Sequence, residues 1–368
     1  MSNLQEDELK RELTKINVSE EINACPIDFS MSRAANPRAH QKQKDYAGLD
    51  PSNFNDRARF SADQAPQFTK KFGDGADQLP IEADRYRLIW SKHCPWATRI
   101  AVVIDLLGLD RVISKGVVDP LRPAGVVGDW FFTLDDGDVD PVLKTHSLGE
   151  NYRKADSDYS SRVTVPALVD IKTGKVVNND FHHLTLDLEV SWGKFKKAGA
   201  PDLYPKDLRS DIDALNQIIL MDVNNAVNTA GLARSQEDYE RTYDQIFNRL
   251  DWLEERLGKH RFLFGNHLTD TDIRLYVTLV RFDLVFYQKY YVNKKRLIDY
   301  PNLWNYTKDL YSFPSFKKNT DFDSMKKRFF QIDHTPLSDL PRIIPKGPDL
   351  TIWDEPNDRD RFGKIGSN

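Results

Sequence analysis

One cysteine lies where a strand-like run of residues meets a helix-like run. Residues Arg85 to Trp90 are typical of a strand, and the helical pattern that begins at Pro95 ends at Gly108. Because proline is favoured at the first position of a helix, Cys94 is predicted to be the N-cap. The unsatisfied N–H groups and the positive dipole at that end favour a thiolate over a thiol. The pattern therefore predicts a strand, a reactive sulfur and a helix in immediate succession.

The third position after Cys94 limits the type of thiol chemistry. Dithiol oxidoreductases carry a second cysteine there, in a C-x-x-C motif, whereas this chain has Ala97. A disulfide formed at Cys94 must then be resolved by a thiol from elsewhere, which indicates exchange with a small thiol such as glutathione. An inert, buried cysteine is the alternative, because cysteine is among the most buried residue types. The Cys-Pro step between strand and amphipathic helix favours the reactive thiol.

The composition excludes several other classes of protein. The 368 residues suffice for about two domains of ~150 residues each. The 52 basic and 56 acidic residues leave a net charge of −4, so we expect neither a nucleic acid nor a membrane as partner. No apolar run approaches the ~18 residues of a membrane span, and residues 1–21 lack the apolar core of a secretory signal. With Cys25 and Cys94 as the only cysteines, a disulfide scaffold is excluded and a reducing cytoplasm is expected.

The pattern along the chain predicts an arm followed by a thioredoxin-like domain. Residues 1–80 show no sustained period and are predicted to form an extended arm laid over the folded body. Residues 81–195 show a βαβ unit, a long insertion from Asp119 to Tyr159, then a β-hairpin around Gly174 and a helix. This is the thioredoxin-like order, in which Pro166 occupies the place of a cis proline opposite the cysteine.

The remainder of the chain is predicted to be helical. Residues 196–320 carry apolar positions at steps of three and four from Leu208 to Val227 and from Tyr239 to Leu257. Thr269 with Asp272 is typical of an N-terminal cap, here before a nearly apolar helix that reaches Phe286. Residues 321–368 are rich in proline and are predicted to be an extended tail. The predicted architecture is an α/β thioredoxin-like domain followed by an all-α domain.

These motifs resemble those of a known family. The combination of Cys-Pro-Trp-Ala at the first helix with Thr-x-x-Asp at a buried helix is similar to the glutathione transferase fold. More narrowly, the chain resembles the xi class, the glutathionyl-hydroquinone reductases. The sequences that carry this resemblance are RYRLIWSKHCPWATR, GVVDPLRP, KADSDYSSRVTVPALVD, TGKVVNND, LDWLEERLGKHRFLFGNHLTDTDIRLYVTLVRFD and YPNLWNYTKDLY.

The resemblance implies a reaction and a set of site residues. In the family a cysteine thiolate, here Cys94, attacks the sulfur of a glutathionyl-hydroquinone, the hydroquinone leaves, and a second glutathione releases the bound one as a disulfide. The family's thiol-binding positions match Trp130, Arg162 and Val165 of this chain. Arg162 is suited to a glycyl carboxylate, and the Val165 backbone beside Pro166 is suited to pairing with extended glutathione. The resemblance also implies glutathione as cosubstrate, an aromatic small-molecule substrate, no metal and a homodimer.

Two residues after the hairpin depart from the family pattern. Where the family has Asn-Asn-Glu-Ser, this chain has Asp180 and then Phe181. Asp180 keeps a carboxylate for thiol binding, but Phe181 lacks the hydroxyl that binds the γ-glutamyl end. Losing such a hydrogen bond costs about 1–3 kcal/mol when its partner stays buried. We therefore keep another small thiol as an alternative to glutathione. His182 and His183 follow, and solvated or local hydrogen-bonding roles are expected because adjacent histidines on a helix diverge.

The side that would bind the aromatic acceptor differs as well. Where the family tends to place a tyrosine and a histidine, this chain has an aromatic stretch that includes Phe286, Tyr287 and Tyr290. With Trp96 beside the nucleophile, these residues are predicted to bind a flat aromatic substrate. Half-buried packing of the same rings is the alternative.

Three hypotheses remain open from the sequence. They are a cysteine-dependent deglutathionylating reductase, the same chemistry with a different small thiol, and a non-catalytic binding protein on the same scaffold. His93 could support the thiolate if protonated, but it is expected to be exposed and incidental. Cys25 has no motif around it and is treated as structural or free.

Overall fold

The computed structural model describes residues 66–121, 128–331 and 343–363, and these residues divide into two compact units. Of the described residues, those from 66 to 200 and from 318 to 346 form one, here called the sheet unit. Those from 201 to 317 and from 347 to 363 form the other, here called the helical unit. Cys25 lies outside the described residues.

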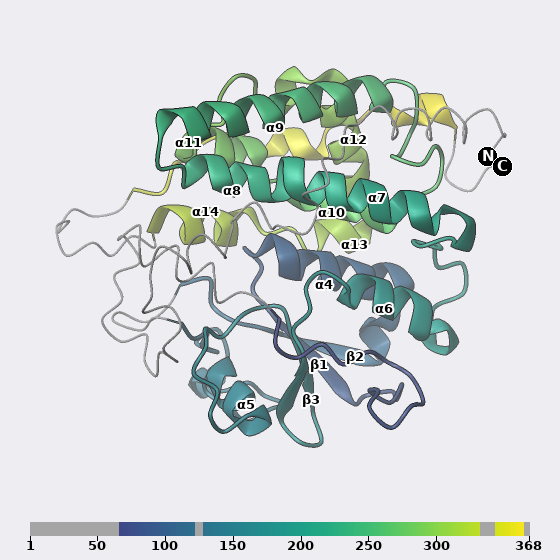
Figure 1. The fold of residues 1–368 in the computed structure, drawn as a ribbon, viewed down its shortest axis with the longest axis vertical. Helices are drawn as coiled ribbons and strands as arrows, with labels where there is room; N and C mark the ends of the chain where they lie inside the picture. The colour runs from purple at the N-terminus through teal and green to yellow at the C-terminus, as the bar shows by residue number, and fades with distance from the viewer. Residues whose placement is uncertain (1–65, 122–127, 332–342, 364–368) are drawn as a thin grey trace. The chain divides into compact units, whose positions relative to one another are not determined.

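The sheet unit is built around four strands in the order β2-β1-β3-β4 (Figure 1). Strand β1 pairs parallel with β2 and antiparallel with β3, and β3 pairs antiparallel with β4. The predicted βαβ unit and hairpin are confirmed, and the fold is thioredoxin-like. The elements are β1 (Tyr86–Trp90), α4 (Pro95–Leu107), β2 (Ile113–Val117), α5 (Leu148–Ala155), β3 (Ala167–Asp170), β4 (Lys175–Asn178) and α6 (Leu184–Ser191).

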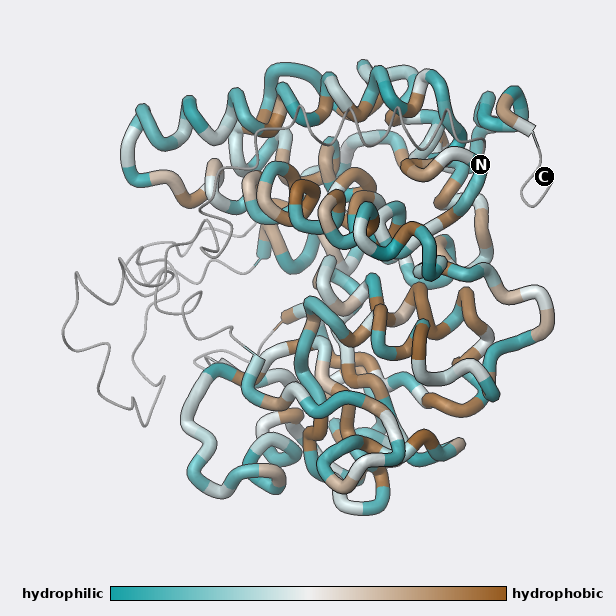
Figure 2. Tube along the Cα trace, turned by 45° about the vertical axis from the view of Figure 1, so that its right-hand side comes forward, coloured by the Kyte–Doolittle hydropathy of each residue, from teal (hydrophilic) through white to brown (hydrophobic). Residues whose placement is uncertain are grey.

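Strand β1 and helix α4 form the core of the sheet unit. Every residue of β1 is buried, as is α4 from Ala97 to its end, and Figure 2 shows hydrophobic residues, in brown, inside this unit. The helix ends where predicted, because Gly108 adopts a left-handed conformation with φ of 71°. A Cβ at Gly108 would lie 2.7 Å from the Cβ of Lys197, so close approach of the chain also requires glycine there.

The described end of the N-terminal arm lies along the edge of the sheet. Thr69 forms a bridge with Asn178 of β4, and the Asn179 side chain accepts hydrogen bonds from the N–H groups of Gln67 and Phe68. The Phe72 ring is buried against Tyr86 and Trp192, with centroids 5.4 and 5.1 Å away. Residues 66–80 are thus part of the sheet unit.

Helix α5 lies inside the predicted insertion from Asp119 to Tyr159, for which no helix was assigned. Ser147 is its N-cap, and the Glu150 carboxylate accepts a hydrogen bond of 3.0 Å from the Ser147 N–H, which completes a capping box. Tyr152 is fully buried and its hydroxyl donates to the carbonyl of Thr164 at 2.9 Å. This helix therefore supports the loop that precedes Pro166.

The helical unit is built from helices, as the apolar periodicity predicts. Asp272 accepts hydrogen bonds from both the N–H and the hydroxyl of Thr269, which confirms the predicted cap of a buried helix. That helix, α10, ends at Leu279 and not near Phe286, since a turn at Val280 and Arg281 separates it from a short π-helix. The elements are α7 (Arg209–Ile219), the π-helix η6 (Leu220–Asn225), α8 (Ala226–Gly231), α9 (Gln236–Leu257), α10 (Asp270–Leu279), the π-helix η7 (Phe282–Phe286), α11 (Tyr287–Lys289), α12 (Pro301–Ser312) and α13 (Pro314–Lys317).

The segment predicted to be an extended tail begins with a helix. Helix α14 (Phe322–Gln331) belongs to the sheet unit, although it follows the helical unit in sequence. Just before it, the Asn319 amide donates to the Asp105 carboxylate of α4 at 2.7 Å. Its apolar side includes the buried Met325, which explains why this part of the tail is helical. Within the described residues, no helix is both long and apolar enough to cross a membrane.

Candidate active site

Cys94 is the N-cap of α4, as predicted. Its backbone is extended, with φ of −77° and ψ of 117°, and Pro95 follows at the first helical position. The peptide bond between Val165 and Pro166 is cis, and the Cys94 Sγ donates to the Val165 carbonyl at 3.6 Å. Cys94 is only 8% exposed. The structure therefore joins three predicted site residues from two separate parts of the chain.

The residue before Cys94 is buried, which corrects the expectation that His93 is exposed. Its Nδ1 lies 2.8 Å from the Ser91 hydroxyl, and its ring packs against Trp130 at a tilt of 33°, with centroids 5.4 Å apart. Trp130, a predicted thiol-binding residue, is itself 2% exposed and lies below the Arg328 guanidinium of α14 at 5.1 Å. Long-range packing against the Trp130 segment explains why the local sequence does not reveal this burial.

The loop before Pro166 carries the other predicted thiol-binding residues. Arg162 is half-buried, and its carbonyl accepts a hydrogen bond of 2.8 Å from the Tyr159 hydroxyl. Val165 is buried and presents its carbonyl to Cys94. Between these two residues, the Thr164 carbonyl accepts a hydrogen bond from the Tyr152 hydroxyl. Burial raises the pKa of Tyr152 to about 12, so this phenol stays neutral and can donate. The loop is thus fixed on both sides of Thr164.

Asp180 lies at the start of α6, where its carboxylate is engaged in three hydrogen bonds. Its Oδ1 accepts from the N–H groups of His182 and His183, and its Oδ2 lies 2.8 Å from the His183 Nδ1. Burial raises the pKa of Asp180, but the hydrogen bonds from His183 and the backbone outweigh burial and leave the pKa below its usual range. Asp180 is therefore ionised near neutral pH, and His183 has the local role that was expected.

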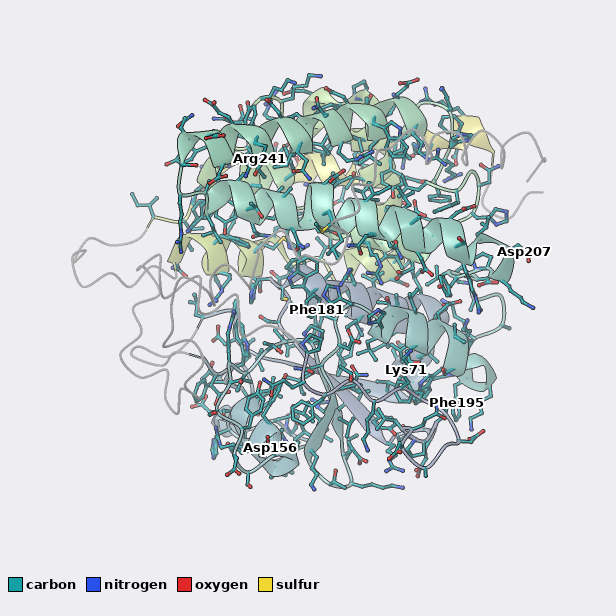
Figure 3. The ribbon with its side chains drawn as sticks, in the orientation of Figure 1. Lys71, Asp156, Phe181, Phe195, Asp207 and Arg241 are labelled. Atoms are coloured by element: carbon teal, nitrogen blue, oxygen red, sulfur yellow. The ribbon has the colours of Figure 1, made fainter. Side chains whose placement is uncertain are left out.

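Phe181, labelled in Figure 3, packs against Trp96, which lies two positions after Cys94. The Phe181 and Trp96 rings have centroids 5.4 Å apart, and both rings are half-buried. The Arg99 guanidinium lies 5.0 Å above Trp96 and donates to the Phe181 carbonyl. The Phe181 ring also contacts the ring of His182, with centroids 4.0 Å apart. An aromatic surface therefore stands where the family pattern has a hydroxyl.

The three predicted acceptor-binding residues of the aromatic stretch lie in the helical unit. Phe286 is 2% exposed and stacks on Tyr290, with centroids 5.8 Å apart. Tyr290 covers Gly231 so closely that a Cβ there would lie 2.2 Å from its ring. Tyr290 and Tyr287 are half-buried. These contacts fit the packing interpretation, and a substrate-binding role for the three residues stays a prediction.

One neighbour of the site, Arg328, was not predicted. It is far from Trp130 in sequence, and its surroundings (Lys326-Lys327-Arg328) have the composition of an ordinary solvated helix face. Among the described residues, no three or more histidine, cysteine or acidic side chains lie together so that they could hold a metal ion.

Comparison with known proteins defines the class of the chain. Residues 236–309 match the family model described as the C-terminal domain of glutathione S-transferase. The chain is 38% identical over 306 residues to the glutathionyl-hydroquinone reductase YqjG of Escherichia coli, covering 82% of this chain and 90% of that protein. Together with the fold and the N-cap cysteine, this shows that the chain belongs to the glutathione transferases.

Solved structures narrow the class. The chain is 35% identical to the xi glutathione transferase of Phanerochaete chrysosporium, with a TM-score of 0.72, covering 80% of this chain and 99% of the other. It is 36% identical to the glutathione-bound structure of YqjG from Escherichia coli, with a TM-score of 0.71, covering 80% and 96%. The chain is therefore a member of the xi class, the glutathionyl-hydroquinone reductase family, and an enzyme of the glutathione transferase type. This membership disfavours the non-catalytic scaffold.

Proposed function

We propose that this protein removes glutathione from glutathionyl-hydroquinones or related aromatic thioethers through a mixed disulfide on Cys94. The observation that carries the proposal is the position of the Cys94 sulfur at the start of α4, 3.6 Å from the carbonyl that precedes the cis proline. The N–H groups and dipole of the helix terminus stabilise a sulfur anion there. The relatives named glutathionyl-hydroquinone reductases support the substrate class.

The proposed reaction has two displacements at sulfur. The Cys94 thiolate attacks the thioether sulfur, so that a sulfur–sulfur bond forms and the sulfur–carbon bond breaks. The electron pair of the broken bond goes to the ring carbon, which takes up a proton and becomes the hydroquinone. A second glutathione, as its thiolate, then attacks the bound glutathione sulfur and leaves as glutathione disulfide. Cys94 returns to the thiolate. The net reaction consumes one glutathione, whose sulfur joins the sulfur of the thioether in glutathione disulfide.

Intact-mass analysis tests the nucleophile. After incubation with oxidised glutathione, we expect one glutathione adduct on the wild-type protein and on Cys25→Ser, and none on Cys94→Ser. Turnover of a glutathionyl-hydroquinone should fall at least about a thousandfold in Cys94→Ser and stay unchanged in Cys25→Ser. An adduct that persists in Cys94→Ser, or full activity of that variant, would contradict the proposal.

A second candidate is the same chemistry with a small thiol other than glutathione. The contact of Phe181 with Trp96 favours it, because an aromatic ring replaces the hydroxyl expected at the γ-glutamyl end. Turnover with a panel of small thiols decides between the two. Saturation by glutathione in the usual micromolar to low millimolar range would exclude this candidate.

We also propose that the enzyme is a homodimer in a reducing, cytoplasmic environment. The family resemblance supports the dimer, and the scarcity of cysteines supports the compartment. Light scattering coupled to size-exclusion chromatography measures the oligomeric state directly, and a monomeric mass at working concentration would contradict the dimer.

A further inference from the structure

Helix α14 is attached to the segment that carries the nucleophile. Asp321, just before the helix, forms an ion pair of 3.3 Å with Lys92, which lies two residues before Cys94. Asn319 is anchored on Asp105 of α4. Both contacts lie within the sheet unit. The late part of the chain is therefore held in a defined place beside Cys94.

Arg328 extends from α14 to the Trp130 ring. Its guanidinium carbon lies 5.1 Å from the ring centroid, and its Nη1 donates to the Pro120 carbonyl at 3.4 Å. Trp130 in turn packs against the His93 ring, with centroids 5.4 Å apart, and His93 directly precedes Cys94. A continuous series of contacts thus joins Arg328 to the residue before the nucleophile. The indole that contacts Arg328 is also a predicted thiol-binding residue.

We propose that Arg328 is a positioning residue of the thiol site, which acts by holding Trp130 in the orientation that binds the small thiol. The inference rests on the proposed function, because it assigns the thiol-binding role to Trp130. The planar guanidinium suits this task, since it attracts the face of an indole and hydrogen-bonds a backbone carbonyl at the same time. Arg328 itself need not touch the thiol.

The charge over the ring is the part of Arg328 that the proposal depends on. A partly desolvated cation–π contact is strong enough to change a binding equilibrium about three- to tenfold. Arg328→Met keeps the aliphatic stem and removes the charge. Arg328→Lys keeps a cation but loses the planar group and its hydrogen-bond geometry. Lys327, the exposed neighbour on the same helix, provides the matched control.

Steady-state kinetics with varied glutathione test the role in the site. We expect the KM for glutathione to rise about three- to tenfold in Arg328→Met with kcat nearly unchanged, to rise less in Arg328→Lys, and to stay at the wild-type value in Lys327→Ala. An unchanged KM in Arg328→Met, or a fall in kcat alone, would overturn the inference. Equal defects in the Met and Lys variants would also overturn it, because the charge would then not matter.

Hydrogen exchange measured by mass spectrometry separates this inference from the proposed function. In Arg328→Met we expect faster exchange in the peptide that contains Trp130, and no change there in Lys327→Ala. Unchanged exchange would overturn the inference whatever the activity. If the wild-type protein consumes no glutathione, the proposed function fails, and the exchange result alone decides whether Arg328 holds Trp130.

Discussion

Phe181 places an aromatic ring against Trp96, two residues after Cys94, where the family pattern has a hydroxyl. Its ring packs on Trp96 and on His182, while its carbonyl is held by Arg99. An aromatic ring favours flat or apolar groups and can neither donate to a carboxylate nor accept from an ammonium group. We therefore expect weaker binding of the γ-glutamyl end of glutathione, with the sulfur chemistry at Cys94 unchanged.

The first prediction concerns that residue. We expect Phe181→Ser to lower the KM for glutathione by about fivefold or more, because a hydroxyl would supply a hydrogen bond worth about 1 kcal/mol or more. Steady-state kinetics with glutathione and with a thiol that lacks the γ-glutamyl group measure the effect. Phe181→Ala serves as the control, since it removes the ring without adding the hydroxyl. Equal kinetics of the Ser and Ala variants would show that the hydroxyl is irrelevant.

At the scale of the element, the start of α6 depends on one ionised side chain. The Asp180 carboxylate accepts two backbone N–H groups and the His183 imidazole, and its pKa lies below the usual range. A carboxyl whose pKa is lower in the folded state stabilises the fold above its unfolded pKa of about 3.9, and this contribution is lost as pH falls through the folded pKa.

The second prediction follows from the lowered pKa of Asp180. We expect Asp180→Ala to lower the free energy of unfolding by about 1 kcal/mol at pH 7, and Asp180→Asn by less, because the amide oxygen still accepts from the backbone. The difference between wild type and Asp180→Asn should shrink towards zero as the pH falls below about 4. Urea unfolding at several pH values measures it. A difference that grows on acidification would contradict the assignment.

The third prediction concerns the end of α4. Gly108 combines a φ of 71° with a Cβ position 2.7 Å from Lys197, whereas Gly137 has a similar φ of 70° and open space around it. Gly108→Ala should therefore lower the free energy of unfolding by about 2 kcal/mol, and Gly137→Ala by about 1 kcal/mol. Equal losses in thermal or urea unfolding would mean that the contact with Lys197 relaxes without cost.

Elements with strong local signals could be predicted from the sequence, and one with a weaker signal was missed. The helix α4 is bounded by Pro95 and Gly108, so its limits follow from backbone preferences of single residues. Helix α5 is short and lies in a segment rich in glycine and aspartate, so its helical pattern is weak in the sequence. The capping box of Ser147 and Glu150 was the signal that could have revealed it.

At the scale of the whole molecule, the chain leaves the sheet unit and later returns to it. The return is fixed by a buried polar cluster in which the Asp105 carboxylate accepts from Lys115 at 2.6 Å and from Asn319 at 2.7 Å. Burial lowers the pKa of Lys115, although Asp105 opposes this shift. The charged pair is therefore sensitive to the loss of any partner.

The fourth prediction tests that cluster. We expect Asn319→Ala to lower the free energy of unfolding by about 1–3 kcal/mol, because Asp105 loses a buried hydrogen bond. In a double-mutant cycle with Asp105→Asn, the two changes should be non-additive by about 1 kcal/mol. Urea unfolding followed by tryptophan fluorescence measures all four proteins. Strict additivity would show that the two side chains do not interact in solution.

The site could be predicted only where the chain's local pattern or the family resemblance specifies it. Cys94 and Pro166 follow from a helix start and a strand start, and the structure brings them together. The burial of His93 and the position of Arg328 depend on Trp130, which is distant from both in sequence. Such contacts arise from tertiary packing, and single-residue preferences carry no information about them.

The return of the chain to the sheet unit has a consequence for the order of events during synthesis on the ribosome. When residue 200 leaves the exit tunnel, the strands and α4 are present but Asn319, Asp321 and Arg328 have not yet been made. The neighbourhood of Cys94 is thus completed only after residue 328 has been translated. A nascent or prematurely terminated product carries Cys94 without α14, the helix that contacts the residues around it.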